Sequence, residues 1–104
     1  MASARAVYLQ PAVTVLNAIS DVIELQNGRL TYADTPNGKI HFTLAMYSFK
    51  WELRFDVRDI GQNRSSVTLG IDGEDRCKDK MIRREFMLLD SLLVDRAKIE
   101  INEI

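Results

Sequence analysis

One carboxylate, Glu85, stands where the pattern of the sequence calls for an apolar side chain. Met81, Leu88 and Leu92 recur around it at helical spacing, so a helix here brings Glu85 to the middle of its apolar face. A carboxylate that is buried alone in apolar surroundings is costly. We therefore expect one of three arrangements: Glu85 is paired, it is protonated with a raised pKa, or it faces a gap beside the helix.

The neighbours expected for Glu85 are compatible with a small ligand-binding pocket. Lys78 and Arg96 have nearly the same angular position on the helical wheel, about two turns before it and about three turns after it. Tyr32 and Trp51 would line the pocket from the sheet. The candidate ligand-binding residues are thus Glu85, Trp51, Tyr32 and Arg96. The alternative is a rotated helix that leaves Glu85 at the rim, with its stem covering apolar surface.

Residues that commonly carry catalysis or bind metals are scarce. The chain has one histidine, His41, and one cysteine, Cys77, which are too few for a multi-ligand His/Cys metal site. His41 falls on the polar face of its strand, and Cys77 lacks an activating partner. We predict no catalytic residue, no metal and no cofactor. An enzyme that uses Glu85 as an acid or base is the least favoured alternative, because a second well-placed polar group is missing.

Composition and charge limit the class of protein. The chain has 104 residues, 46% of them hydrophobic, and a formal charge of −1, which fits one globular domain. The balanced charge gives no bulk attraction to nucleic acid or to an acidic membrane, so we predict neither as a partner. No apolar run approaches the length of about 18 residues that a membrane span requires, and we expect no signal peptide. The single cysteine favours a reducing compartment, so a cytoplasmic location is expected.

Two helices are predicted, one on each side of a run of strands. The first covers about residues 11–25: Pro11 suits a first helical turn, and Asn27-Gly28 supplies a C-terminal stop. The second covers about residues 75–96, with early acidic residues and without an internal Gly or Pro. This second helix is strongly amphipathic, and its apolar side should lie against the sheet.

Alternating polarity predicts an antiparallel meander of four strands, at about residues 29–34, 40–46, 49–58 and 65–71. The apolar phase flips between Met46 and Phe49, as a hairpin with a two-residue turn at Tyr47 and Ser48 requires. Tyr-Ser is a poor pair for such a turn, so a four-residue loop is equally consistent. A bulge in one long strand is a third, less favoured reading.

The first hairpin and the two ends of the chain complete the expected sheet. Matching apolar alternation places Tyr32 opposite Phe42 across a five-residue loop, 35–39, which brings Tyr32 to the helix-facing side. Along residues 50–58 the charges alternate in sign, as expected for a solvated outer face. The sequence is compatible with either a strand or irregular structure at residues 4–9 and again at residues 97–104. The predicted sheet therefore has four, five or six strands.

The segments KWELRFDVRDIGQNRSSVTLGID and MIRREFMLLDSLL lead from antiparallel strands through a glycine into a long amphipathic helix. This order resembles the START-like, helix-grip fold of the polyketide-cyclase-like ligand binders, over about residues 39–95. The resemblance implies a two-layer α+β fold that binds a small apolar or amphipathic ligand between the sheet and the C-terminal helix. It carries over no catalytic residue.

Two functions follow as expectations. The first is non-catalytic binding of a small apolar or amphipathic ligand near Glu85. The alternative is a protein–protein interaction or structural module, either a homodimer or an accessory subunit, which would use its last helix and tail. Met87 and Val94 project from the outer side of that helix, and the tail adds the apolar residues Ile99, Ile101 and Ile104.

Overall fold

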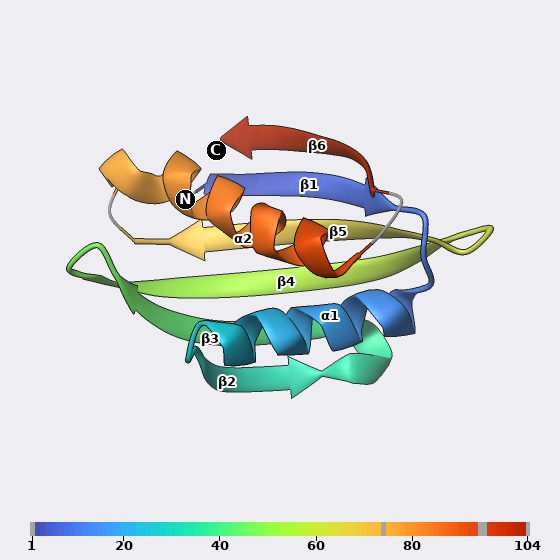
Figure 1. The fold of residues 1–104 in the computed structure, drawn as a ribbon, viewed down its shortest axis with the longest axis horizontal. Coiled ribbons are helices and arrows are strands. Elements are labelled where there is room, and N and C mark those ends of the chain that lie inside the picture. The colour runs from blue at the N-terminus through green and yellow to red at the C-terminus, as the bar shows by residue number, and fades with distance from the viewer. Residues whose placement is uncertain (1, 74, 94–95, 104) are drawn as a thin grey trace.

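A computed structural model describes the backbone of residues 2–73, 75–93 and 96–103, and the side chains of residues 3–73 and 76–93. It shows a two-layer α+β fold in which two helices cover one face of an antiparallel sheet (Figure 1). The strands are β1 (Ala2–Tyr8), β2 (Arg29–Asp34), β3 (Lys39–Met46), β4 (Phe49–Gly61), β5 (Arg64–Asp72) and β6 (Arg96–Glu103). The helices are α1 (Ala12–Leu25) and α2 (Lys78–Leu92), with short 3-10 turns η1 (Thr35–Asn37) and η2 (Asp75–Cys77).

The order of the strands is β2-β3-β4-β5-β1-β6, and all neighbours are antiparallel. Strands β2 to β5 form the predicted meander. The N-terminal segment, which the sequence left open, is strand β1 and pairs with β5, so the main body of the sheet has five strands. Strand β6 pairs with the other edge of β1 as the sixth.

The phase flip after Met46 is a two-residue hairpin turn. Met46 is paired with Phe49, and Tyr47 and Ser48 have positive φ angles of 54° and 67°. Two central residues with positive φ characterise the turn whose twist matches that of the flanking strands. The indole N–H of Trp51 also donates a hydrogen bond of 2.9 Å to the carbonyl oxygen of Met46. The two-residue alternative is therefore confirmed.

The predicted register of the first hairpin is wrong. The loop has four residues: η1 is followed by Gly38 at φ 70°, and Asp34 is paired with Lys39. An irregularity between Leu30 and Tyr32 then shifts the pairing once more. Tyr32 consequently lies opposite His41, and Leu30 rather than Tyr32 is opposite Phe42. A shift of one residue moves a side chain to the other face of a sheet, so Tyr32 lies on the outer face.

The core lies between the sheet and both helices. Its largest fully buried side chains come from β1, β3, β4, β5, α1 and α2, and include Trp51, Tyr8, Phe42, Phe55, Phe86, Ile19, Leu53, Leu69, Ile71, Met81, Ile82 and Leu89. The inner face of the sheet under α2 is thus filled by side chains. The apolar side chains that the alternating pattern directs to this face are all buried: Phe42, Leu44, Trp51, Leu53, Phe55, Val67 and Leu69.

Helix α2 is shorter than predicted. It begins at Lys78 after the η2 turn, and it ends at Leu92, because Leu93 adopts extended backbone angles (φ −116°, ψ 137°). The chain then runs back as β6, which begins at Arg96 and pairs with β1. Arg96 is therefore not on the helix, and the polar line predicted through Lys78, Glu85 and Arg96 is interrupted.

Candidate functional site

Glu85 is buried between the helices and is paired. Its side chain is 0% exposed, and its Oε1 accepts a hydrogen bond of 2.8 Å from Nε2 of Gln26. Gln26 is the C-cap residue of α1, so this bond links the end of α1 to the middle of α2. The second carboxylate oxygen, Oε2, is buried without a hydrogen-bond partner. Glu85 therefore holds the two helices together and retains an unused acceptor.

Burial also changes the acidity of this carboxyl group. Loss of solvation raises the pKa of Glu85 from 4.5 to about 7, although the hydrogen bond from Gln26 and the charge of Arg84 act in the opposite direction. A buried group with such a pKa exchanges its proton near neutral pH. Two of the three arrangements expected from the sequence, pairing and a raised pKa, are thus both present.

Trp51 belongs to the packed end of the sheet next to the β3–β4 turn. Its side chain is fully buried, and its only polar group is already bonded to Met46. A Cβ atom added at Gly73 would overlap the indole ring, which shows how closely the β5–α2 connection passes over it. Trp51 is therefore a core residue at this position, with no donor free for a ligand.

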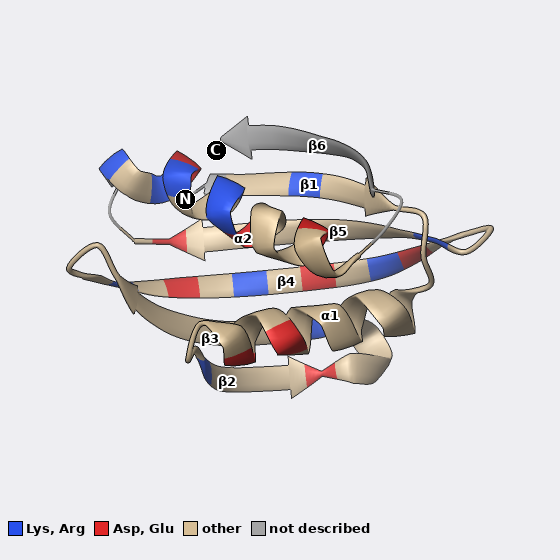
Figure 2. Cartoon of the chain, viewed as in Figure 1, with Lys and Arg blue, Asp and Glu red and all other residues tan. Residues whose placement is uncertain are grey.

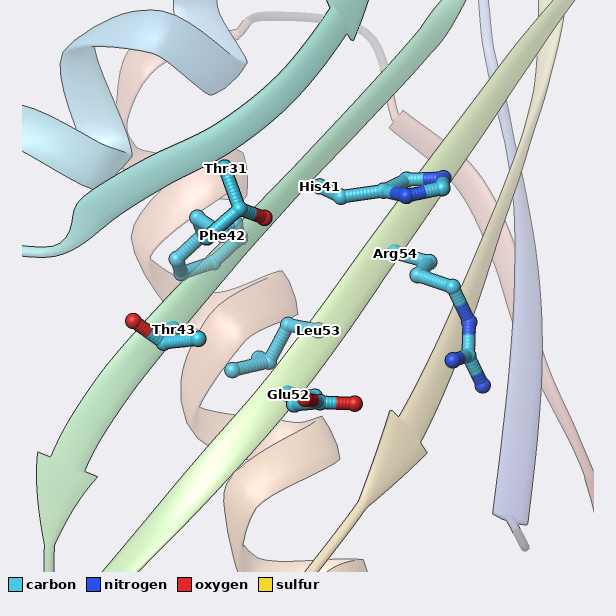
Figure 3. A pocket seen from close by; sticks show the side chains of 7 residues that line it. All are labelled: Thr31, His41, Phe42, Thr43, Glu52, Leu53 and Arg54. Carbon is cyan, nitrogen blue, oxygen red and sulfur yellow. The ribbon is translucent and has the colours of Figure 1, made fainter.

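Tyr32 lies away from Glu85, on the outer face of the sheet. It is 47% exposed, and its ring centroid is 4.9 Å from that of His41. Beside this pair, the outer face has a hollow of about 230 Å³ (Figure 3). This outer-face hollow is lined by Thr31, His41, Phe42, Thr43, Glu52, Leu53 and Arg54. The structure therefore does not bring Tyr32 and Glu85 together, and the side chain of Arg96 lies outside the described residues.

The surroundings of His41 disfavour the charged form of its ring and lower its pKa. Partial burial lowers the pKa of His41 below 6.5, and the charges of Arg54 and Lys39 lower it further. Arg54 itself pairs with Asp72 at 3.1 Å. Two of the side chains that line the outer-face hollow, His41 and Arg54, are thus already engaged with neighbouring side chains.

An open groove lies between the two helices. Its volume is about 460 Å³, and its lining residues are Asp21, Glu24 and Leu25 of α1 and Leu92 of α2. We call it the helix groove. Gln26, the partner of Glu85, directly follows Leu25 in the chain. This groove was not predicted from the sequence. The residue that could have indicated it is Leu25, an apolar residue on the polar side of its helix.

A second surface hollow, of about 280 Å³, borders the first half of α2. Its lining residues are Tyr47, Lys80, Arg83, Arg84 and Met87, and we call it the basic patch. The ammonium group of Lys80 lies 4.7 Å from the centroid of the Tyr47 ring, within the range of a cation–π contact. Positive charge and exposed apolar surface therefore meet in this patch.

Within the described ranges, the side chains do not gather three or more His, Cys, Asp or Glu residues into a potential metal site. In the same part of the chain, no helix combines the length and the hydropathy needed to cross a membrane.

Comparison with known proteins informs on the fold. Neither a protein-family model nor a curated protein sequence matches this chain. Among solved structures, the crystal structure of the di-domain ARO/CYC StfQ from the steffimycin biosynthetic pathway matches with a TM-score of 0.53 and 10% sequence identity. The match covers 88% of this chain and 44% of the StfQ chain, so this chain spans less than half the length of that protein. The fold of this chain is thus similar to that of an aromatase/cyclase of the helix-grip type, as its sequence pattern predicted.

Proposed function

We propose that this protein binds a small apolar or amphipathic ligand without catalysing a reaction, at the place where α2 meets α1 above the sheet. The observation that carries the proposal is the helix groove, whose lining residue Leu25 is directly followed in the chain by Gln26, the partner of Glu85. A volume of about 460 Å³ falls within the range of about 300–1,000 Å³ that is typical of small-molecule sites. The polyketide-cyclase-like fold is consistent with such a role.

The position of the ligand follows from what is already filled. The space directly between the sheet and α2 is occupied by core side chains such as Trp51 and Phe86. Leu25 of α1 and Leu92 of α2, in contrast, offer exposed apolar surface in the groove between the two helices. A ligand whose apolar body rests on these two leucines would remove them from water, which is favourable at about 25 cal/mol per Å² of apolar surface.

The polar end of the ligand is suggested by Glu85. Its Oε2 is a buried acceptor without a partner, and such groups are rare and costly in folded proteins. A hydroxyl or amine group directed toward the Glu85–Gln26 pair would supply the missing hydrogen bond. This makes an amphipathic ligand with one donor group a better fit than a pure hydrocarbon.

The test uses N-phenyl-1-naphthylamine, an uncharged apolar fluorophore, in titrations of the purified protein. We expect saturable binding, and a loss of affinity of about tenfold or more in Leu25→Arg and Leu92→Arg, because each places a charge in the apolar part of the groove. Leu30→Arg is the matched control: Leu30 is 55% exposed on β2 and should leave binding unchanged. Equal binding by all variants, or the absence of saturation, would contradict the proposal.

A second measurement examines Glu85 separately. In Glu85→Leu, the thermal stabilisation that the fluorophore gives to the wild-type protein should decrease, because the donor group loses its acceptor. A variant that becomes more stable and keeps the full ligand-induced shift in Tm would exclude Glu85 from the site.

A further inference from the structure

The two helices carry opposite charges on adjoining surfaces. Asp21 and Glu24 lie on the second half of α1, and Lys80, Arg83 and Arg84 lie on the first half of α2 (Figure 2). The helices run in opposite directions across the sheet, and the hydrogen bond between Gln26 and Glu85 joins the end of α1 to the middle of α2 (Figure 1). The acidic end of α1 therefore lies next to the middle of α2, where the basic first half of α2 ends.

These charges form no ion pair among the described residues, although Lys80 lies over the ring of Tyr47. Among the described residues, the ion pairs join Lys39 to Asp56, Arg54 to Asp72 and Arg58 to Asp56, all of them on the strands. No ion pair in that part of the chain includes Asp21, Glu24 or any cation of the basic patch. The Nε atom of Arg84 is also buried without a hydrogen-bond partner.

Helix stability does not explain the charges either. The C-terminal end of a helix favours cations and the N-terminal end favours anions, each by about 0.3–1 kcal/mol. Glu24 lies in the last turn of α1, and Lys80 lies in the first turn of α2, so both have the unfavourable sign. Charges in such positions are better explained by a partner than by the fold of the single chain.

Exposed apolar side chains accompany both groups of charges. Met87 is 70% exposed in the basic patch, and Leu25 is 65% exposed in the helix groove. Each surface therefore combines apolar area with charge, and the two surfaces have opposite signs. A partner that fits both must present an acidic apolar surface and a basic apolar surface side by side, and a second copy of this chain does so.

We propose that two copies of this protein associate through their helical faces, about a two-fold axis that lies in the interface parallel to the helices. Such an axis brings α2 of each copy onto α1 of the other. Lys80 and Arg83 of one copy then meet Asp21 and Glu24 of the second, and the same contacts form twice. The association itself is independent of any ligand.

One consequence of this arrangement rests on the proposed function. Helix α2 of the second copy covers the helix groove, which is open in the single chain. Its Met87 then adds apolar surface opposite Leu25. The dimer thereby encloses a ligand that one copy alone leaves partly exposed to water.

The expected strength of the dimer follows from the size of the face. Helices of 14 and 15 residues are each about 21–23 Å long, so the contact is at or below the lower end of stable interfaces, which begins at about 1,200 Å² in total. The dimer should therefore be of modest affinity. Because its charge pairs are exposed at the rim, salt should weaken it.

The experiment is sedimentation equilibrium with charge-reversed variants. The wild-type protein should form a dimer at low ionic strength that dissociates as salt is added. Lys80→Glu combined with Arg83→Glu makes both surfaces acidic, and Asp21→Lys combined with Glu24→Lys makes both basic, so each variant alone should self-associate about tenfold or more weakly. An equimolar mixture of the two variants should form a heterodimer, because every contact then joins opposite charges.

The control changes the net charge equally at another place. Lys50→Glu combined with Arg58→Glu alters the exposed outer face of β4 and should dimerise as the wild-type protein does. All variants are compared by circular dichroism and cooperative melting, so that a folding defect is recognised. Wild-type protein that is monomeric at every concentration, or folded variants whose mixture does not associate, would overturn the proposal.

The outcome is separable from that of the ligand test. Dimerisation is measured without fluorophore, and fluorophore binding is measured on monomeric protein at high salt. Loss of binding in Leu92→Arg without a wild-type dimer supports the ligand and removes the dimer. If the protein forms a salt-sensitive dimer but does not bind the fluorophore saturably, the dimer is supported and the ligand proposal is contradicted.

Discussion

A carboxylate on the outer side of the sheet and one on the helix-covered side have different surroundings. On the outer face Asp56 is partly exposed and forms ion pairs of 3.5 Å with Lys39 and 3.4 Å with Arg58, while its Oδ1 is buried without a hydrogen-bond partner. On the inner face Glu85 of α2 is fully buried, has one hydrogen bond, and has its pKa raised to about 7. The partly exposed carboxylate is thus balanced by two cations at the surface, whereas the buried one has no cation partner, links two helices and makes stability depend on pH.

The largest effect expected from this comparison concerns packing. Trp51→Ala should lower the free energy of unfolding by about 3–5 kcal/mol, because it leaves a cavity in a filled core. Tyr32→Ala, on the outer face, should cost less than about 1 kcal/mol. Urea denaturation of both variants gives the two values. Similar losses would mean that the two faces do not differ in packing.

The second prediction is the dependence of stability on pH. The carboxyl group of Glu85 has its pKa raised by folding from 4.5 to about 7, so the folded state binds the proton more tightly than the unfolded state does. Stability from this group is complete below about pH 4.5 and is lost as pH rises through about 7. The difference between these pKa values corresponds to about 3 kcal/mol.

Urea titrations at several pH values, with Glu85→Gln as the comparison, test this prediction. The variant should lack the decline in stability between about pH 4.5 and pH 7.5. Asp56→Asn is a control on the outer face and should retain it. If Glu85→Gln declines as steeply as the wild-type protein, another group is responsible.

A smaller effect is expected for the ion pair of the outer face. Arg54→Met removes the ion pair of 3.1 Å between Arg54 and Asp72. Both of these side chains are partly exposed. Solvent screens such pairs, so the free energy of unfolding should fall by less than about 1 kcal/mol, and added salt should reduce the difference. A loss as large as that in Trp51→Ala would contradict the contrast between the faces.

The smallest effect is a change in the pKa of His41. Arg54→Met and Lys39→Met should each raise this pKa toward 6.5, because each removes a nearby positive charge. Partial burial, the larger cause, stays in place, so the pKa should remain below that value. NMR titration of the single imidazole measures the change. A pKa that falls in either variant would show that the charges act in the other direction.

The register of the central strands was predictable because it is fixed by burial. Leu53 is paired with Ile71 and Val57 with Val67, so that apolar side chains lie opposite each other on the buried face. A slip of one residue would expose every apolar side chain of the strand. Strand β2 lacks this constraint, because Leu30 and Tyr32 are exposed at the edge of the sheet. Its bulge and four-residue loop could therefore not be read from alternation.

The candidate site was predictable in part. Spacing on the helix placed Glu85 in the middle of the apolar face and left open whether it is buried or lies at the rim; in the structure it is buried. Its partner Gln26 was not predicted, because the contact depends on how α1 crosses the sheet relative to α2. The helix groove depends on the same placement. The role of Glu85, Trp51, Tyr32 and Arg96 in binding a ligand stays a prediction.

Strand β1 has a consequence for the order in which the protein folds. Its partners are β5 and β6, so Ala2 is opposite Ile71 on one side and Glu103 on the other. The hairpins from β2 to β5 join neighbouring segments and can form early, whereas β1 is synthesised before β5 and β6 and must wait for both partners. Contacts between such distant segments slow folding. During synthesis, β1 therefore precedes both of its partners and is among the last of these strands to be paired.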